Sequence, residues 1–264
     1  MSETPAAPQI TGRMFLYERP ELLNPGAHGA LGLKPLDRPF GFVSSVRAVP
    51  LTVSEIAAAA RDYPVVFLSA EEPAPMAVVG LVDEENLFVD EEGRWDNLTY
   101  VPGYVRRYPF SVAREESGDR AAIVIDAAFP GLVADGELRL FENGEPTDYT
   151  KEAIEFSKRY EQDRMVGGQA LEMIKKFDLI ANQTAQYTPN GASEPQPFAQ
   201  YFGIDEQKLR DLPDDQHMEL RRTNLLPVLY AQLMSMGNWR SLVQRRATRH
   251  DMTEASVFSP KTVS

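Results

Sequence analysis

The most conspicuous absence from the 264-residue sequence is cysteine, which does not occur at all. Without cysteine the chain has no disulfide, no thiol nucleophile and no thiolate ligand for zinc or an iron–sulfur cluster. Histidine is nearly as scarce, because only His28, His217 and His250 occur, far apart in the sequence. None of them belongs to an HExxH or HxD pattern, so neither zinc-peptidase chemistry nor the His-Asp-His iron site of oxygenases is supported.

Glycine patterns that hold phosphates are also absent. The sequence contains no GxSxG, GxxxxGK[ST] or GxGxxG motif. The glycines in NPGAHGALG are typical of a loop, whereas a nucleotide site needs backbone amides presented at a defined glycine spacing. We therefore expect no cofactor and no nucleotide function.

Long apolar runs are missing as well. No stretch approaches the roughly 20 apolar residues that span a bilayer, so we expect no transmembrane segment. The start of the sequence, MSETPAAPQITGRM, lacks the basic beginning and apolar core of a secretory signal. The expected location is cytoplasmic.

Positive charge is in the minority. Lys and Arg number 27 against 39 Asp and Glu, which gives a formal net charge of -12. An acidic surface repels phosphate backbones and anionic lipid, so nucleic acid is not an expected partner. The 43% hydrophobic content is ordinary for a globular protein, and one large domain or two packed lobes both fit it.

Composition along the chain defines its expected organisation. Residues 1–12 and 251–264 are polar and are predicted to be flexible tails. Between them we expect a single domain over 13–250. Its first part, 36–146, has short apolar runs broken by turn residues, and its second part, 147–250, has helical periodicity. This pattern predicts an α+β fold, in which an antiparallel or mixed β-sheet in the N-terminal half packs against a helical C-terminal half.

Local signals in the first part predict a helix and several strands. Thr52 and Glu55 resemble a capping box that opens a short helix. Gly93 suits a turn that needs a positive φ, and Asn143-Gly144 is a strong hairpin signal. The expected strands are PVVFLS, MAVVGLV, NLFVD, AAIVID (121–126) and ELRLF (137–141).

The second part predicts helices separated by one polar loop. Gly167-Gly168 weakens a helical pattern and indicates either a break or a close packing contact. Pro227 should kink or divide the segment around it. The expected elements are a largely helical 147–180, a loop over 182–197, a short helix at 205–212, a helix starting at Pro213, and a last helix capped by Asn238 whose end carries Arg240, Arg245, Arg246 and Arg249.

Five residues are ligand-binding candidates. His28 lies in a Gly-rich segment as a ligand or general base, and Asp126 ends a strand, where catalytic carboxylates are common. Arg106 and Arg107 could bind a carboxylate or phosphate, and Asn86 precedes them. His28 could instead be a loop histidine bonded to backbone, and Arg106 and Arg107 could form a structural salt bridge. We find no catalytic set among them.

The richest segment is 86–110. Its aromatic residues could line a pocket, although aromatic residues near a sheet are more often core. Acidic residues around its turns could hold a cation, but their spacing does not match an EF-hand loop and favours a solvated face. These residues are Trp95, Tyr100, Tyr104, Tyr108 and Phe110, with Asp83, Glu84, Glu85, Asp90, Glu91, Glu92 and Asp96.

Several long runs resemble the bacterial SapC family. They are RPFGFVSSVRAVPLTVSEIAAAARDYPVVF, ENLFVDEEGRW with YVPGYVRRYPF, and LLPVLYAQLMSMGNWRSLVQRR, and the resemblance covers roughly residues 15–246. The family takes its name from a bacterial surface-layer locus, so the resemblance implies a role in surface-layer formation or export. It implies no catalytic residue.

Three hypotheses follow. The first is an accessory or binding protein in surface-layer or envelope biogenesis, with a protein or peptide partner. The second is an uncharacterised enzyme acting on a peptide or small metabolite, which needs two or more of the five candidates to meet in one cleft. The third is a component of the surface layer itself. The sequence leaves the oligomeric state open.

Overall fold

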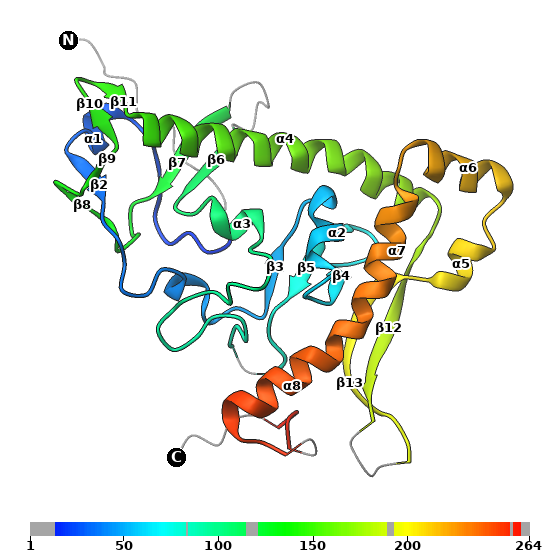
Figure 1. Ribbon diagram of the computed structural model, residues 1–264. Coiled ribbons are helices and arrows are strands. Elements are labelled where there is room, and N and C mark those ends of the chain that lie inside the picture. The colour runs from blue at the N-terminus through cyan, green and yellow to red at the C-terminus, as the bar shows by residue number, and fades with distance from the viewer. Residues whose placement is uncertain (1–13, 83, 115–120, 189–192, 254–255, 260–264) are drawn as a thin grey trace. The chain divides into compact units, whose positions relative to one another are not determined.

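The computed structural model describes residues 14–82, 84–114, 121–188, 193–253 and 256–259 (Figure 1). The predicted tail over 1–12 lies outside these residues. The described residues form two compact units. Unit 1 comprises the segments Met1–Asp37 and Arg107–Glu161, and unit 2 comprises Arg38–Arg106 and Gln162–Ser264.

Unit 1 consists of short antiparallel strands, a short helix and the start of a long one. One sheet has the order β1-β7-β6, another has the order β8-β2-β9, and β10 pairs with β11. The elements are β1 (Pro20–Leu22), α1 (Pro25–His28), β2 (Leu31–Leu33), β6 (Phe110–Arg114), β7 (Ala121–Asp126), β8 (Leu132–Ala134), β9 (Leu138–Arg139), β10 (Phe141–Glu142) and β11 (Glu145–Pro146), followed by the start of α4 (Asp148–Lys176).

Two strand signals of unit 1 are confirmed. AAIVID forms β7 as predicted. The Asn143-Gly144 turn joins β10 to β11 with φ values of 52° and 82°, which are the left-handed angles that such a tight hairpin needs. The predicted strand 137–141 is divided into β9 and β10, because Leu140 between them turns into the core.

The core of unit 1 is a small apolar cluster. Its buried members are Leu33, Phe110, Ile125, Leu140 and Phe141, and α4 covers the cluster with partly buried side chains. These residues come from four strands and the link between two of them, so burial of apolar side chains holds the short strands together.

The helix α4 runs unbroken over 29 residues, through Gly167-Gly168. Gly167 is a close packing contact, since a Cβ there would lie 3.0 Å from the Val53 side chain, whereas Gly168 faces open space. Tyr160 and Ile174 of this helix are buried, whereas Met165 is exposed.

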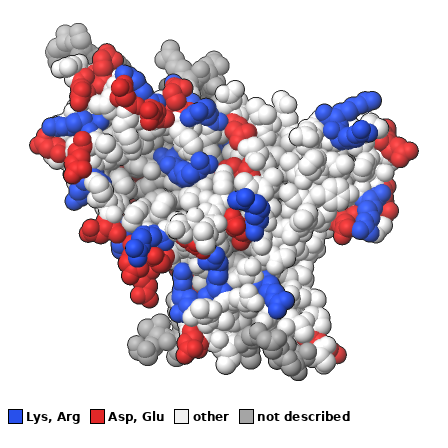
Figure 2. Space-filling model, in the orientation of Figure 1, with Lys and Arg blue, Asp and Glu red and all other residues white. Residues whose placement is uncertain are grey.

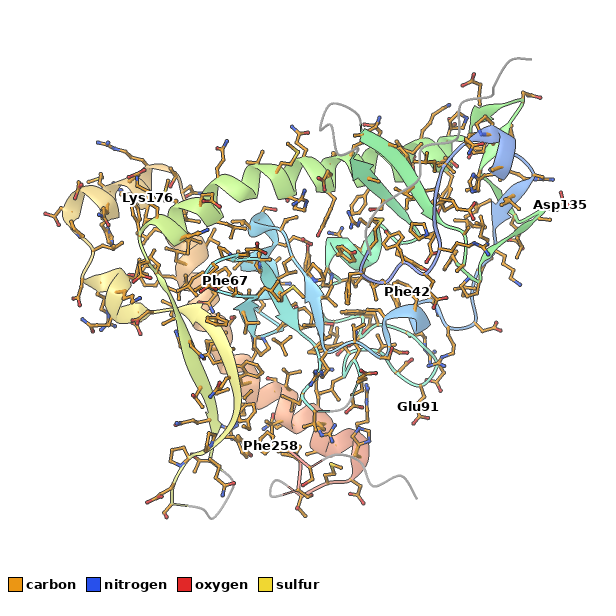
Figure 3. The ribbon with its side chains drawn as sticks, turned by 180° about the vertical axis from the view of Figure 1, so that it is seen from behind. Phe42, Phe67, Glu91, Asp135, Lys176 and Phe258 are labelled. Atoms are coloured by element: carbon orange, nitrogen blue, oxygen red, sulfur yellow. The ribbon has the colours of Figure 1, made fainter. Side chains whose placement is uncertain are left out.

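Unit 2 is built on a five-stranded antiparallel sheet of order β12-β13-β4-β5-β3. The predicted strands PVVFLS and MAVVGLV appear as β4 (Val65–Phe67) and β5 (Pro75–Val78). The predicted loop over 182–197 is too long, because both of its ends belong to the hairpin of β12 (Ile180–Tyr187) and β13 (Gln196–Ile204). The sheet continues through the pair Phe202–Phe67 to β4 (Figure 3).

Helices and 3-10 turns complete unit 2. The Thr52–Glu55 capping box is present, the Gly93 turn has a φ of 71°, and Pro227 lies in the first turn of a new helix, as predicted. The elements are η1 (Gly41–Val43), β3 (Ala48–Pro50), η2 (Val53–Glu55), α2 (Ile56–Ala59), α3 (Gly103–Arg106), α5 (Glu206–Arg210), α6 (Asp214–Arg222), α7 (Leu226–Ser235), η3 (Met236–Asn238) and α8 (Trp239–His250).

Buried polar side chains of α7 fix it on the sheet. The Gln232 amide donates to the Val65 carbonyl at 2.8 Å and accepts from the Ile204 amide at 3.1 Å. The hydroxyl of Ser235 accepts the Val65 amide at 3.0 Å. Asn238 precedes α8 as expected, but its side chain donates to the carbonyls of residues 60 and 63 and does not cap the helix.

The buried side chain of Arg246 ties residues 256–259 to α8. It donates to the carbonyls of Val257 and Ser259 at 2.7 and 2.9 Å, and to the Glu85 carboxylate at 2.7 Å. His250 also bonds to Glu85 at 2.9 Å. These contacts join the helix end to two distant parts of unit 2.

Phe258, labelled in Figure 3, completes this packing. Its ring stacks on Phe198 of β13 with centroids 4.6 Å apart, and it meets Tyr187 of β12 edge-on at 6.1 Å. Val257 beside it is fully buried.

Antiparallel sheets in the N-terminal half and helices in the C-terminal half make this an α+β protein, as predicted. No helix in the described ranges is both long and apolar enough to cross a membrane. Acidic and basic side chains are interspersed on the face shown in Figure 2.

Candidate functional site

Asn86, one of the five candidates, has a structural role at the start of the segment 86–97. Its side chain is 1% exposed. The amide oxygen accepts the Phe88 N–H at 2.9 Å, and the amide nitrogen donates to the Val43 carbonyl at 3.3 Å. Both polar atoms are therefore used to hold the loop.

The predicted strand over 86–90 is wrong, because the chain reverses at once. A single bridge pairs Val89 with Trp95 across the turn between them. Gly93 closes the turn with a positive φ, and a Cβ there would lie 2.5 Å from the Cβ of Arg38. Only glycine meets both demands, so the turn is fixed by one residue.

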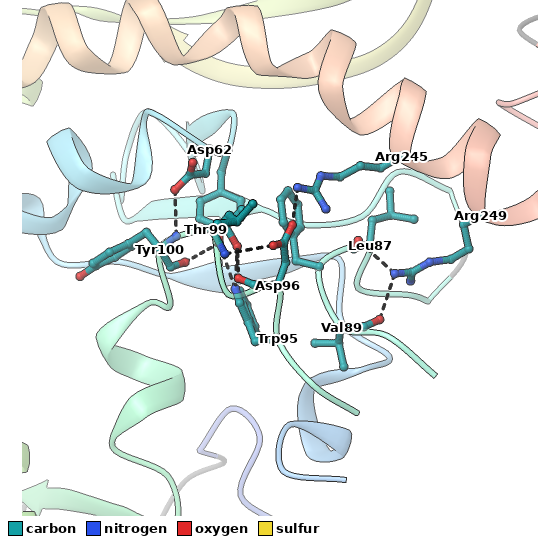
Figure 4. Close-up of polar contacts among 12 residues, drawn as sticks. Asp62, Leu87, Val89, Trp95, Asp96, Thr99, Tyr100, Arg245 and Arg249 are labelled. Carbon is teal, nitrogen blue, oxygen red and sulfur yellow. Dashed lines mark hydrogen bonds and ion pairs between the residues drawn. The ribbon is translucent and has the colours of Figure 1, made fainter. Parts of the chain in front are cut away.

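Trp95 is buried below this turn. Its indole N–H donates to the hydroxyls of Tyr63 at 3.2 Å and Thr99 at 3.1 Å (Figure 4). Phe40 packs edge-on against the indole at 5.8 Å. The Tyr63 hydroxyl donates in turn to the Tyr100 carbonyl, and burial raises the pKa of Tyr63 well above its ordinary value. The ring is thus held in one orientation.

Arg245 reaches the same turn from α8. One of its terminal nitrogens donates to the Asp96 carboxylate at 2.7 Å, and its guanidinium lies 4.1 Å from the centre of the Phe88 ring. Burial alone would raise the pKa of Asp96, but the bond and charge of Arg245 and the amide of Leu98 together bring it below its ordinary value. Asp96 therefore stays ionised and fixes the guanidinium.

Arg249, one helical turn further along α8, binds main-chain carbonyls. It donates to Asn86 at 2.8 Å, and to Leu87 and Val89 at 3.0 Å each (Figure 4). No carboxylate of the described residues pairs with it. Its charge is met there only by carbonyl dipoles.

These side chains line one open pocket of about 480 Å³ in unit 2. Apolar and aromatic side chains line the pocket together with three arginines. The aromatic side chains suit a flat part of a ligand and the arginines suit an anionic part. The lining residues are Leu87, Phe88, Asp90, Arg94, Trp95, Asp96, Asn97, Arg245 and Arg249.

Asp126, another candidate, is fully buried in unit 1. Its carboxylate accepts the amides of Glu18 at 3.0 Å, Arg19 at 2.9 Å and Ala128 at 3.0 Å. The Tyr108 hydroxyl donates to it at 2.9 Å, and burial together with this carboxylate raises the pKa of Tyr108. Asp126 is therefore used to join three stretches of backbone.

The remaining unit 1 candidates also have partners. His28 is 2% exposed, its Nδ1 bonds to the backbone of Asn24, and its Nε2 lies 3.5 Å from the Glu21 carboxylate. Arg107 is 7% exposed and lies 4.4 Å from the centre of the Tyr160 ring.

Arg106 belongs to unit 2 and is half exposed. It donates to the Tyr100 hydroxyl at 3.2 Å, and a second contact of 3.9 Å joins it to the buried Glu55 carboxylate. Glu55 also accepts the amides of Gly103 at 2.6 Å and Thr52 at 2.8 Å. Burial of the Tyr100 hydroxyl, and secondarily its hydrogen bond to the Glu55 carboxylate, raise the pKa of Tyr100 to about 12. This carboxylate organises three segments around it.

Within each unit the predicted candidates have separate hydrogen-bond partners. In unit 1 His28 and Asp126 share none of theirs, and in unit 2 neither do Asn86 and Arg106. Sequence reasoning missed Arg245 and Arg249 as site residues and assigned them to the negative end of the last helix. Their spacing of four, which places them on one helix face, was the available signal.

Fold and pocket together define an α+β protein with a fixed arginine–aromatic pocket. The model of the SapC family matches residues 23–242, and the chain belongs to this family. No curated protein and no solved structure matches the sequence.

Proposed function

We propose that this SapC-family protein is a non-enzymatic binding protein that assists surface-layer or envelope biogenesis or export. The family name supplies the link to the surface layer. The arginine–aromatic pocket on segment 86–97 and α8 is the single observation that carries the binding role.

The fixed geometry of the pocket supports binding. Arg245 is held by Asp96, Arg249 by three carbonyls and Trp95 by two hydroxyls, so little side-chain order is lost when a ligand binds. His28 and Asp126, the buried titratable candidates, lie outside this pocket and hold backbone in place. Binding is therefore favoured over acid–base catalysis.

Helix α7 adds a surface suited to protein contact. Tyr230 is 41% exposed and Met234, one turn further along, is 80% exposed. Pro227 precedes them on the same exposed face. Large apolar side chains grouped in this way favour a protein partner.

A strain lacking the gene tests the proposal. We expect less surface-layer or envelope protein at the cell surface, measured by fractionation against total protein, with restoration by the wild-type gene. An unchanged surface fraction would contradict the proposal, and so would turnover of a peptide or metabolite by the purified protein.

A further inference from the structure

We propose that the pocket on segment 86–97 and α8 binds an oxyanion, a carboxylate or phosphate group, through Arg245 and Arg249. The inference rests on the proposed function and gives its ligand class. The formal net charge of the chain is -12, so an anion would be attracted only by the local arrangement of these arginines.

Arg249 supplies positive charge that no described carboxylate neutralises. Among the described residues it donates to the carbonyls of Asn86, Leu87 and Val89. Carbonyl dipoles hold the guanidinium in place but leave its full unit charge, and a guanidinium fixed at a pocket wall attracts an anion.

Arg245 supplies donors. Only one of its nitrogens donates to Asp96, and its other N–H groups have no acceptor in the part of the chain that the structure describes. Its side chain is 34% exposed, and its guanidinium contacts the Phe88 ring at the pocket wall, 4.1 Å from the ring centre. A planar fork with open donors matches an oxyanion that accepts two hydrogen bonds.

The two acids that line the pocket do not cancel this charge. Asp90 is held by Arg94, whose backbone amide and side chain keep the pKa of Asp90 low, and Asp96 is held by Arg245. Three arginines and two aspartates line the pocket, and Glu92, outside the lining, also pairs with Arg94 at 3.0 Å. Among the lining arginines, Arg249 is the one that no carboxylate of the described residues pairs with.

The two tryptophans of the chain give a site-specific readout. We would titrate the ¹⁵N-labelled full chain with sodium phosphate, sodium acetate and sodium chloride at matched ionic strength, and follow both indole N–H signals. Trp95 lines the pocket and Trp239 does not. A saturable shift of the Trp95 signal is expected, with phosphate or with acetate according to the anion that the pocket selects.

Matched variants of α8 complete the test. Arg249→Gln and Arg245→Gln should each weaken anion binding at least tenfold, whereas Arg240→Gln, on the exposed surface and outside the pocket lining, should leave it unchanged. Equal shifts with chloride, shifts of both indoles, or equal binding by all three variants would overturn the ligand class. If the titration fails in this way but the gene-deletion strain still has less surface-layer or envelope protein, the proposed function holds and only the ligand class is wrong.

Discussion

Arg246 and Glu85, 161 positions apart in the sequence, form a buried ion pair with 2.7 Å between Nη1 and Oε1. Arg246 is fully buried and Glu85 is 7% exposed. The pair fixes the last helix next to the loop that leads into segment 86–97. The relative position of the two pocket walls in unit 2 therefore depends on it.

Glu85→Gln should strongly destabilise the fold. The substitution leaves the Arg246 guanidinium buried without its carboxylate, and removing one partner of a buried pair costs about 3 kcal/mol or more. Urea unfolding followed by circular dichroism measures the change.

Asp148→Asn is the control for that substitution. Asp148 pairs with Lys151 at 3.2 Å, but its side chain is 97% exposed, and exposed pairs contribute about 1 kcal/mol or less. Equal losses of unfolding free energy in the two variants would show that the buried Arg246–Glu85 pair contributes no more stability than an exposed pair.

The two adjacent glycines of α4 should respond differently to alanine. Gly168→Ala should stabilise the protein by up to about 1 kcal/mol, because alanine favours a helix interior and the added methyl meets open space. Gly167→Ala has the same helical gain, but its Cβ would lie 3.0 Å from Val53 Cγ2. We expect its melting temperature to fall below that of Gly168→Ala, and the reverse order would contradict this packing.

The Asp96–Arg245 contact should make stability depend on pH. Because the pKa of Asp96 is lower in the folded state, the ionised carboxylate stabilises the fold above the unfolded pKa of about 3.9. That contribution is lost as the pH falls through the folded pKa. The difference in unfolding free energy between wild type and Asp96→Asn should be constant from about pH 7 to 5 and shrink below about pH 4.

Arg245→Gln provides the control for the pH profile. Without the guanidinium, Asp96→Asn should have a much smaller effect at neutral pH. An undiminished effect in that background would assign the pH dependence to another group.

Sequence reasoning succeeded where local chemistry decides the structure. The Thr52–Glu55 capping box, the Asn143-Gly144 hairpin and β7 each depend on residues next to one another. It failed for the β12–β13 hairpin, whose sequence is polar because much of both strands is exposed. Pairing of Phe202 with Phe67 and the contact of Gln232 with Ile204 stabilise that hairpin, and neither is visible locally.

The pocket was beyond prediction for a similar reason. Segment 86–97 was recognisable as unusual, but its partners Arg245 and Arg249 are far away in the sequence. Arg245, for example, lies 149 positions after Asp96, to which it donates. The basic end of α8 has an adequate local explanation in the helix dipole. Only the folded chain shows that these arginines contact the loop.

Complementation of the gene-deletion strain tests the account most directly, with the surface-layer or envelope protein fraction as the readout. The wild-type gene and Arg240→Gln should restore that fraction. The double variant Arg245→Gln/Arg249→Gln, expressed at equal abundance, should not. Full restoration by the double variant would contradict the claim that the arginine–aromatic pocket carries the function.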